Sequence, residues 1–238
     1  MGELTDRRAR KKAQTRELIR SVAQRRFDED GFDAVTIADI ARECDVAVQT
    51  VFNHFPTKEE LFFDGRTPWV DGLAEAVRTR PPSVAPLTAL RAHLVETIAE
   101  LVGSHRCPNH RRYIAALDAS DALLAYQLAL VHQSELKLRQ ALLDAWAADG
   151  NVAPADPTSA APVIAAIWVA ASRSLIKTQR PLLTEGADPD VAAAAAMDMA
   201  HRVLSQLELG ANAVHGRVAV APVPQADTGW PHAVRRAG

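Results

Sequence analysis

The chain has 238 residues, of which 48% are hydrophobic and 24% charged, an ordinary composition for a globular protein of one large or two small domains. Its net charge of −2 does not by itself favour a nucleic-acid ligand, and its two cysteines, Cys44 and Cys107, exclude a disulfide framework and fit a reduced, cytoplasmic compartment. The N-terminus lacks an apolar signal core and no stretch reaches about 18 uninterrupted apolar residues, so we expect a soluble protein without a membrane span.

The N-terminal segment is predicted to form a basic amphipathic helix over about residues 8–29, after a loose arm over residues 1–6. The apolar residues at helical spacing are Leu18, Ile19, Val22, Ala23 and Phe27. Gly31 follows at the position where a left-handed residue commonly ends a helix. Residues 7–26 contain nine basic side chains and one acidic side chain, a net charge of +8. Such a stripe suits DNA phosphates, and a solvated helix face is the alternative.

Residues 36–61 have the pattern of three short helices. Their N-cap and capping-box pairs are Thr36 with Asp39 and Thr57 with Glu60. Residues 45–47 interrupt the first helix, and Pro56 ends the second, expected over residues 48–54, because proline disfavours a helical conformation in the residue before it. The side chains expected to face outward from the second helix are Val48, Gln49, Thr50, Asn53 and His54. A helix-turn-helix with a polar second helix fits the major groove of DNA.

The sequence TIADIARECDVAVQTVFNHFPTKEELF resembles the DNA-binding domain of the TetR family of bacterial repressors. The positions that match the usual family wording are Thr36, Ile40, Ala41, Val46, Thr50, Phe55, Lys58, Glu59 and Leu61. Phe52 and His54 stand where the family usually has tyrosine. Ala47 replaces the usual serine, so the second helix loses its expected side-chain cap, which costs about 1 kcal/mol of local stability.

This pattern predicts that a dimer reads a palindromic DNA operator, with half-sites about 34–36 Å apart. The amides of Gln49 and Asn53 suit adenine edges, and Val48 and the methyl group of Thr50 suit thymine methyls. The residues expected to contact phosphates are Thr36, Thr50, His54 and Lys58, with Arg7, Arg10 and Lys11 from the basic helix reaching phosphates or the adjacent minor groove. Phe52 is expected in the core. A solvated surface is the alternative for each polar residue.

Beyond residue 66 the chain is predicted to be helical. Helical spacing is expected after residue 69 and over residues 87–102, 111–119, 121–149, 159–177 and 190–209. A strand signal at residues 217–220 is too short to predict a strand. The expected fold class is all-α: a helix-turn-helix DNA-binding domain over residues 1–66, a larger effector-binding and dimerisation domain over residues 67–210, and a disordered or loosely packed tail over residues 211–238.

The last two long helices, about residues 159–177 and 190–209, are apolar around most of their circumference and must be buried on most sides. Pairing across a two-fold axis would bury both helices in a four-helix interface, so we expect a homodimer there. The TetR resemblance implies the same interface. A monomeric core is the alternative.

The TetR resemblance also implies a small-molecule effector that binds in the second domain and releases the DNA. Because the helices there are apolar, the effector is expected to be largely hydrophobic. The candidate lining residues are His93, Tyr113, Tyr126, His132, Trp168 and Arg173. Each of these residue types is also common in cores or on surfaces.

Two alternative functions remain open. The first is an effector-independent DNA-binding dimer, in which the second domain serves only dimerisation and has a solid core. The second is a helical metal-dependent enzyme. His105, Cys107 and His110 lie close together, and His132 and Glu135 have a di-iron spacing, but neither set has the further ligands that a site requires. Nucleophile-elbow, P-loop and dinucleotide-binding motifs are absent from the sequence, so we expect no catalytic residues, metal or cofactor.

Overall fold

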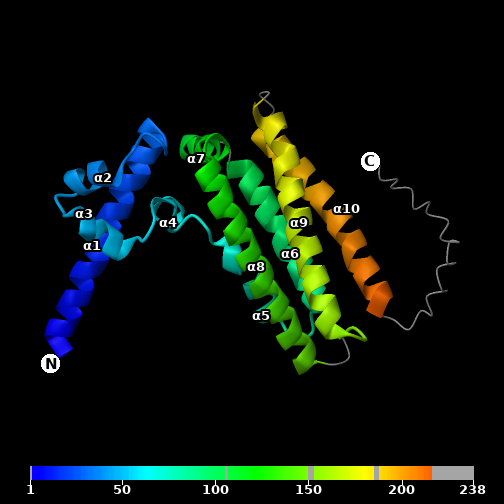
Figure 1. The fold of residues 1–238 in the computed structure, drawn as a ribbon. Helices are drawn as coiled ribbons and strands as arrows, with labels where there is room; N and C mark the ends of the chain where they lie inside the picture. Colours follow the sequence, from blue (N-terminus) through cyan, green and yellow to red (C-terminus); the bar gives the residue numbers. More distant parts are fainter. Residues whose placement is uncertain (1, 105–106, 150–152, 185–187, 216–238) are drawn as a thin grey trace, which may run out of the picture.

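The computed structural model describes residues 2–104, 107–149, 153–184 and 188–215, and the regular secondary structure within these ranges is entirely helical, as predicted. Ten helices occupy these residues: α1 (Gly2–Asp30), α2 (Ile37–Glu43), α3 (Val48–His54), α4 (Lys58–Phe63), α5 (Trp69–Arg78), α6 (Pro86–Gly103), α7 (Pro108–Ala119), α8 (Asp121–Ala148), α9 (Pro157–Thr184) and α10 (Pro189–His215) (Figure 1).

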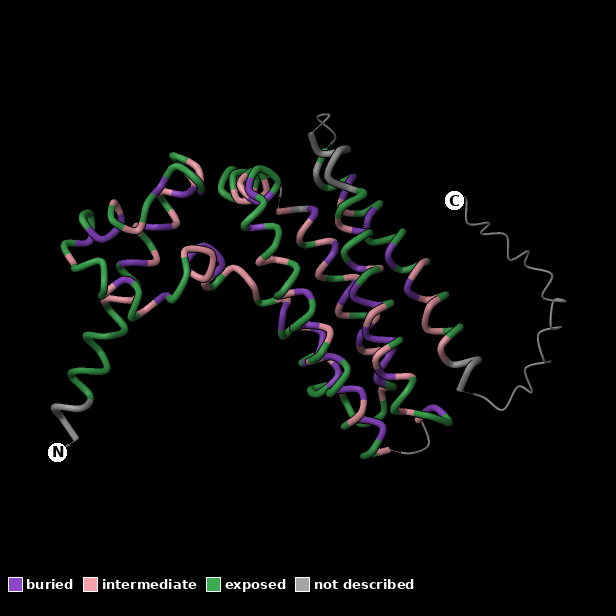
Figure 2. Tube along the Cα trace, in the orientation of Figure 1, coloured by how far each residue is buried: buried purple, intermediate pink, exposed green. Residues whose placement is uncertain are grey.

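A first hydrophobic core holds α1–α4 together. Phe27, Phe32 and Phe62 pack with ring centroids 5.2–5.8 Å apart, which suits favourable aromatic packing. Gly31 ends α1 with a φ of 88°, a conformation that glycine adopts without steric cost, and the chain then folds back so that Phe32 reaches this core. Residues 6–14 of α1 project beyond the core and are exposed (Figure 2).

A second core lies among α5, α6, α8, α9 and α10, which run side by side as a bundle (Figure 1). Trp168 of α9 and Leu138 of α8 are fully buried there. An ion pair at 2.6 Å between Arg91 Nε and Glu208 Oε2 joins α6 to α10. The bundle therefore buries one side of both apolar helices, α9 and α10, within a single chain.

The helix α8 contributes to both cores, and α7 packs at the first core beside its start. The helix α7 meets α8 at 100°. Leu117 of α7 and Leu123 of α8 are buried in the first core, with the side chains of α1–α4. The first core thus includes residues that lie more than fifty positions beyond the domain boundary expected near residue 66.

Several helices are longer than their predicted ranges. The expected N-terminal arm is helical from Gly2, and α10 continues to His215 into the expected tail. The helices α7, α9 and α10 each begin at a proline, before the expected starts at residues 111, 159 and 190, because a missing N–H costs no helical hydrogen bond at the first position. The helix α9 also continues to Thr184, beyond its expected end at residue 177. The weak strand signal at residues 217–220 lies outside the described residues.

By length and composition, the Pro157–Thr178 part of α9 could cross a membrane, and α7 with α8 passes the same test only as a pair bent by 100°. About 39% of the Pro157–Thr178 window is buried inside the molecule. Core helices of soluble proteins have the same composition, so this finding is weak evidence for a membrane span.

Candidate nucleic-acid interface

The helix-turn-helix is formed by α2 and α3. Thr36 caps α2: its hydroxyl accepts a hydrogen bond from the Asp39 amide at 3.2 Å, and the Asp39 carboxylate accepts one from the Thr36 amide at the same distance. Hydrogen bonds from Thr36, followed by one from Arg42, lower the pKa of the Asp39 carboxyl below its usual value. Asp45 takes a φ of 53° in the turn, and α3 then begins at Val48. The predicted capping box and turn are therefore confirmed.

The recognition helix α3 presents a polar face to solvent. Gln49 and Asn53 are exposed, and the Gln49 Nε2 donates a hydrogen bond to the Asn53 Oδ1 at 3.2 Å. This bond holds the two amides next to each other, one helical turn apart. The Ala47 N-cap makes no side-chain hydrogen bond, as its sequence predicts. The opposite face of α3 is anchored in the first core by Val51.

Two apolar side chains also face outward from α3. Val48 is exposed, as expected, and Phe52 is 41% exposed, whereas we expected Phe52 in the core. The reason is its position: Phe52 follows the inward-facing Val51 by one residue, a rotation of about 100° around the helix. Phe52 therefore joins the surface that the sequence assigns to DNA, and its helical register is the signal that would have found it. Thr50 is half-buried beside them.

Arg16 of α1, which sequence reasoning missed, fixes α3 against α1. Its Nη1 donates to the carbonyl oxygen of His54, the last residue of α3, at 2.5 Å, and its Nη2 pairs with the Asp64 Oδ1 just after α4, at 2.5 Å. The guanidinium also lies 4.0 Å from the centre of the Phe55 ring. One side chain thus satisfies a free carbonyl at the end of the recognition helix and connects three helices.

The two predicted phosphate ligands His54 and Lys58 are both partly buried. Burial lowers the pKa of His54 below its usual value, and the positive charges of Lys12 and Arg16 lower it further, which favours the neutral imidazole. Burial likewise lowers the pKa of Lys58, against the opposing effect of Asp33 and Glu59.

The Lys58 ammonium lies 4.2 Å from the centre of the Phe32 ring. In this arrangement its charge is directed at the aromatic core rather than presented on the surface. A phosphate contact by Lys58 therefore requires the side chain to leave that ring. The prediction for Lys58 stays open, and the geometry favours a structural role in the free protein.

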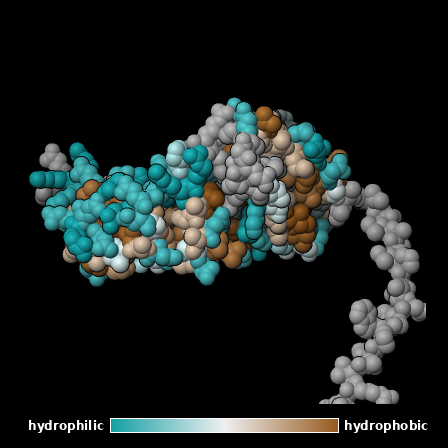
Figure 3. All heavy atoms as spheres, turned by 90° about the horizontal axis from the view of Figure 1, so that it is seen from above, coloured by the Kyte–Doolittle hydropathy of each residue, from teal (hydrophilic) through white to brown (hydrophobic). Residues whose placement is uncertain are grey.

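The basic residues Arg7, Arg10 and Lys11 are exposed on the projecting half of α1. Arg10 forms an ion pair with Asp6, one turn earlier on the same helix. This N-terminal part of the molecule is largely hydrophilic, whereas larger hydrophobic patches lie over the helical bundle (Figure 3). The helix-turn-helix and the projecting α1 thus form one polar end with a local excess of positive charge.

The structure does not bring the six predicted effector-binding residues together. Tyr113 stacks on Phe62 with centroids 5.3 Å apart, and Tyr126 stacks on Phe63 at 5.2 Å, so both tyrosines pack on the first core. Trp168 is 1% exposed in the second core.

The remaining three residues lie elsewhere. His93 of α6 is half-buried against Gly72 of α5, and burial lowers its pKa despite the nearby Glu96 and Glu100. His132 and Arg173 are exposed on α8 and α9. The six residues therefore occupy at least three separate places, and their shared role as a pocket stays a prediction.

No group of three or more histidine, cysteine, aspartate or glutamate residues that could hold a metal occurs in the described part of the chain. Cys107 is exposed at the start of α7 and His110 is half-buried in its first turn, while His105 lies outside the described residues. His132 is exposed, and Glu135, one turn further along α8, is half-buried.

The helix-turn-helix is a motif of DNA-binding proteins, and in this chain it is joined to a helical bundle. Residues 19–64 match the family model for "Bacterial regulatory proteins, tetR family". This N-terminal segment is therefore similar to the DNA-binding domain of TetR-family regulators.

Solved structures share the fold at low sequence identity. The SmeT–triclosan complex is 20% identical, with a TM-score of 0.53 over 80% of this chain and 91% of that chain. SmeT is the repressor of the Stenotrophomonas maltophilia multidrug efflux pump SmeDEF. GusR of Salmonella enterica is 19% identical, with a TM-score of 0.51 over 85% of this chain and 95% of that chain. At these identities the likeness shows the fold alone. None of the curated proteins matches this chain.

Proposed function

We propose that this protein is a cytoplasmic, ligand-responsive repressor that binds a palindromic operator as a homodimer and is released by a small molecule. The observation that carries the proposal is the exposed pair Gln49 and Asn53 on α3. A glutamine or asparagine amide binds the edge of adenine through two hydrogen bonds in the major groove. Both side chains are exposed, and their mutual hydrogen bond holds the two amides side by side.

The DNA contacts of the proposal follow from this placement. Gln49, Asn53 and the apolar Val48 and Phe52 read base edges. The residues proposed to bind phosphates are Thr36, Thr50, Arg7, Arg10 and Lys11, with His54 and Lys58 at the margin of the surface. Phosphate contacts fix the position of a protein on DNA and supply most of its salt-dependent affinity. The domain division at about residue 66 belongs to the same proposal, with α1–α4 as the DNA-binding part.

The homodimer is proposed to form through α9 and α10. Val163 is 57% exposed and Ile167 is 45% exposed, and they lie four residues apart, on one outward face of α9. Val191 and Leu209 of α10 are 66% and 61% exposed. A second copy that covers these side chains would remove apolar area from water, which is the main favourable term in association.

The effector is proposed to be a largely hydrophobic small molecule bound within the helical bundle. The bundle is built from apolar helices, and SmeT, which shares the fold, has been solved with triclosan. The ligand must bind the DNA-releasing conformation better than the DNA-bound conformation, because only differential affinity shifts the equilibrium. Effector-independent DNA binding is the competing proposal, since a tightly packed bundle would serve dimerisation alone.

The experiment begins with selection of DNA sites from a random pool, followed by fluorescence anisotropy with the selected site at 50 and 200 mM salt. We expect a palindromic consensus and an affinity that falls by about a thousand-fold or more between the two salt concentrations. Selection of no consensus would reject operator recognition. A hydrophobic compound panel added to the complex then separates the two proposals: release by a compound supports an effector, and release by none supports the effector-independent dimer.

A further inference from the structure

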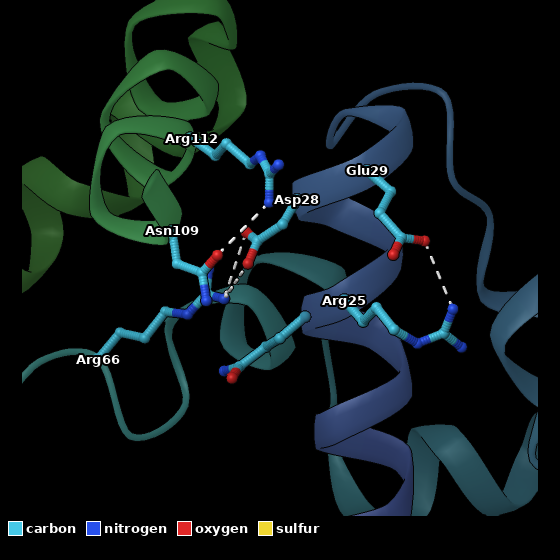
Figure 4. Close-up of a pocket in the computed structure, with 7 residues that line it drawn as sticks. Arg25, Asp28, Glu29, Arg66, Asn109 and Arg112 are labelled. Carbon is cyan, nitrogen blue, oxygen red and sulfur yellow. Dashed lines mark hydrogen bonds and ion pairs between the residues drawn. The ribbon is translucent and has the colours of Figure 1, made fainter. Parts of the chain in front are cut away.

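A cavity of about 340 Å³ lies between α1, the segment after α4 and the first turn of α7 (Figure 4). All of its lining side chains are polar or charged, and three of them are arginines: Arg25 of α1, Arg66, and Arg112 of α7. None of the residues assigned above to DNA, to the effector or to the dimer interface lines this cavity. One wall comes from α1 and the segment after α4, which belong to the helix-turn-helix end of the molecule. The other wall comes from α7, which precedes α8 of the helical bundle.

Arg66 has unused hydrogen-bonding capacity at this cavity. Its Nη2 lies 3.3 and 3.4 Å from the two carboxylate oxygens of Asp28, which are long distances for such a pair. Its guanidinium is held over the rings of Phe62 and Tyr113, with the central carbon 5.2 and 5.4 Å from their centroids. The Nη1 is buried and has no hydrogen-bond partner among the described residues. A buried donor without a partner is costly, so a rotation of this guanidinium that presents Nη1 to an anion in the cavity would be favourable.

Arg112 also has hydrogen-bond donors available for a ligand. Its Nη1 donates to the Asn109 Oδ1 at 3.4 Å, and its side chain reaches across the cavity from α7 towards Asp28 (Figure 4). The guanidinium groups of Arg66 and Arg112 lie on the same side of the cavity near Asp28, whereas Arg25 turns towards Glu29 and also pairs with Glu43 (Figure 4). With Arg25 paired to Glu29 and Glu43, the two positive charges of Arg66 and Arg112 stand against the single negative charge of Asp28. That excess and the planar donor forks suit a carboxylate or phosphate group, which arginine binds through two parallel hydrogen bonds.

We propose that this cavity is a ligand site, separate from the hydrophobic effector site, for a small organic anion that carries a phosphate or carboxylate group bound by Arg66 and Arg112. Its volume is that of a small-metabolite pocket. A ligand that contacts α1 and α7 together stabilises their present arrangement, because binding favours the conformation in which both arginines reach it. An effect of this ligand on operator affinity would depend on the proposed repressor function. Binding of the anion to the cavity does not depend on it.

The test is isothermal titration of the full chain at low ionic strength with two probes, inorganic pyrophosphate and citrate. We expect one saturable site per chain for at least one probe. Arg112→Gln should weaken that binding by about ten-fold or more, because it removes charge-assisted hydrogen bonds to the anion. Arg112 is exposed and lies outside both cores, so the substitution should leave the fold intact. The control Arg139→Gln makes the same change at an exposed position on α8 and should bind as the wild type.

The outcomes separate the ligand classes. Binding of pyrophosphate alone assigns a phosphate ligand, and binding of citrate alone assigns a carboxylate ligand. Absence of saturable binding with both probes, or equal binding by the wild type and Arg112→Gln, would overturn the proposal. Because no DNA is present in the titration, such a failure leaves the proposed repressor function intact.

Discussion

Arg16→Ala tests the idea that one side chain holds the recognition helix in place. The substitution removes a charged hydrogen bond to the His54 carbonyl, worth about 1.5–3 kcal/mol. It also removes an ion pair with Asp64, whose partly exposed geometry limits its value to about 1 kcal/mol or less, and a cation–π contact with Phe55 worth about 0.5–1 kcal/mol. Because one side chain makes all three contacts, the terms overlap, and we expect a total loss of about 2–3 kcal/mol.

The assay is thermal and urea unfolding followed by circular dichroism. A loss of this size should lower the Tm by about 4–12 °C for a chain of this length. Arg16→Lys keeps the charge but loses the planar fork, so it should recover only part of the stability. Arg10→Ala is the control: it removes an exposed ion pair on the same helix and should change the stability by about 0.5 kcal/mol or less.

A loss in Arg16→Ala no larger than that in Arg10→Ala would refute the reasoning. A double-mutant cycle with Asp64→Asn separates the ion pair from the other two contacts. A coupling energy above about 1 kcal/mol would show that the ion pair, rather than the carbonyl cap and the ring, provides most of the stabilisation.

Three further predictions concern DNA reading, assembly and pH. Gln49→Ala should weaken binding to the selected operator by about 5–150-fold and relax the preference at one base pair without changing the salt slope, as measured by anisotropy on single-base variants. Ile167→Glu should convert the dimer to a monomer in light scattering, because it places like charges across the two-fold axis. Burial holds the pKa values of His54 and His93 below the unfolded value near 6.5, so the unfolded chain binds more protons below that pH. The urea midpoint should therefore fall as the pH drops from 7 to 5, and His93→Gln should flatten this dependence.

Each of these predictions has a matched comparison. Gln133→Ala changes an exposed glutamine on α8 and should leave DNA binding unaltered. Leu128→Glu places a charge at a residue that is 55% exposed on α8, outside the proposed interface, and should stay dimeric; a monomer would show that α8 contributes to the interface. The carboxyls of Asp39 and Asp156 have pKa values below their usual value of 3.8, so they stay ionised in the folded and the unfolded chain between pH 5 and 7. They therefore add nothing to the pH dependence of stability in that range. An unchanged midpoint over that range would contradict the assignment to histidine.

The local patterns of the N-terminal segment predicted its structure well. The capping residues Thr36 and Thr57 and the helix stop before Pro56 placed α2, α3 and α4 within a residue or two of their observed bounds. These signals work because each acts within about one helical turn, where a side chain and the backbone groups it satisfies are neighbours in sequence. The starts of α7, α9 and α10 were expected one to three residues too late, because apolar spacing does not register the proline that occupies the first helical position.

Contacts between distant segments were not predictable in the same way. Arg16 reaches the His54 carbonyl across 38 positions, and Lys58 turns towards the Phe32 ring. Tyr113 and Tyr126, which helical spacing assigns to the second domain, pack on Phe62 and Phe63 instead. Periodicity shows which face of a helix is apolar, but it does not show which other helix covers that face.

The sequence by itself determined the all-α class, the helix-turn-helix, its polar recognition face and the basic first helix, because periodicity, capping and charge are local properties. Tertiary structure alone decided which apolar stripes of α9 and α10 are left uncovered and how Arg66 and Arg112 meet at one cavity. The reason is physical: burial and ion pairing depend on where helices separated by tens of residues come together. That arrangement is set by the packing of the two cores as a whole.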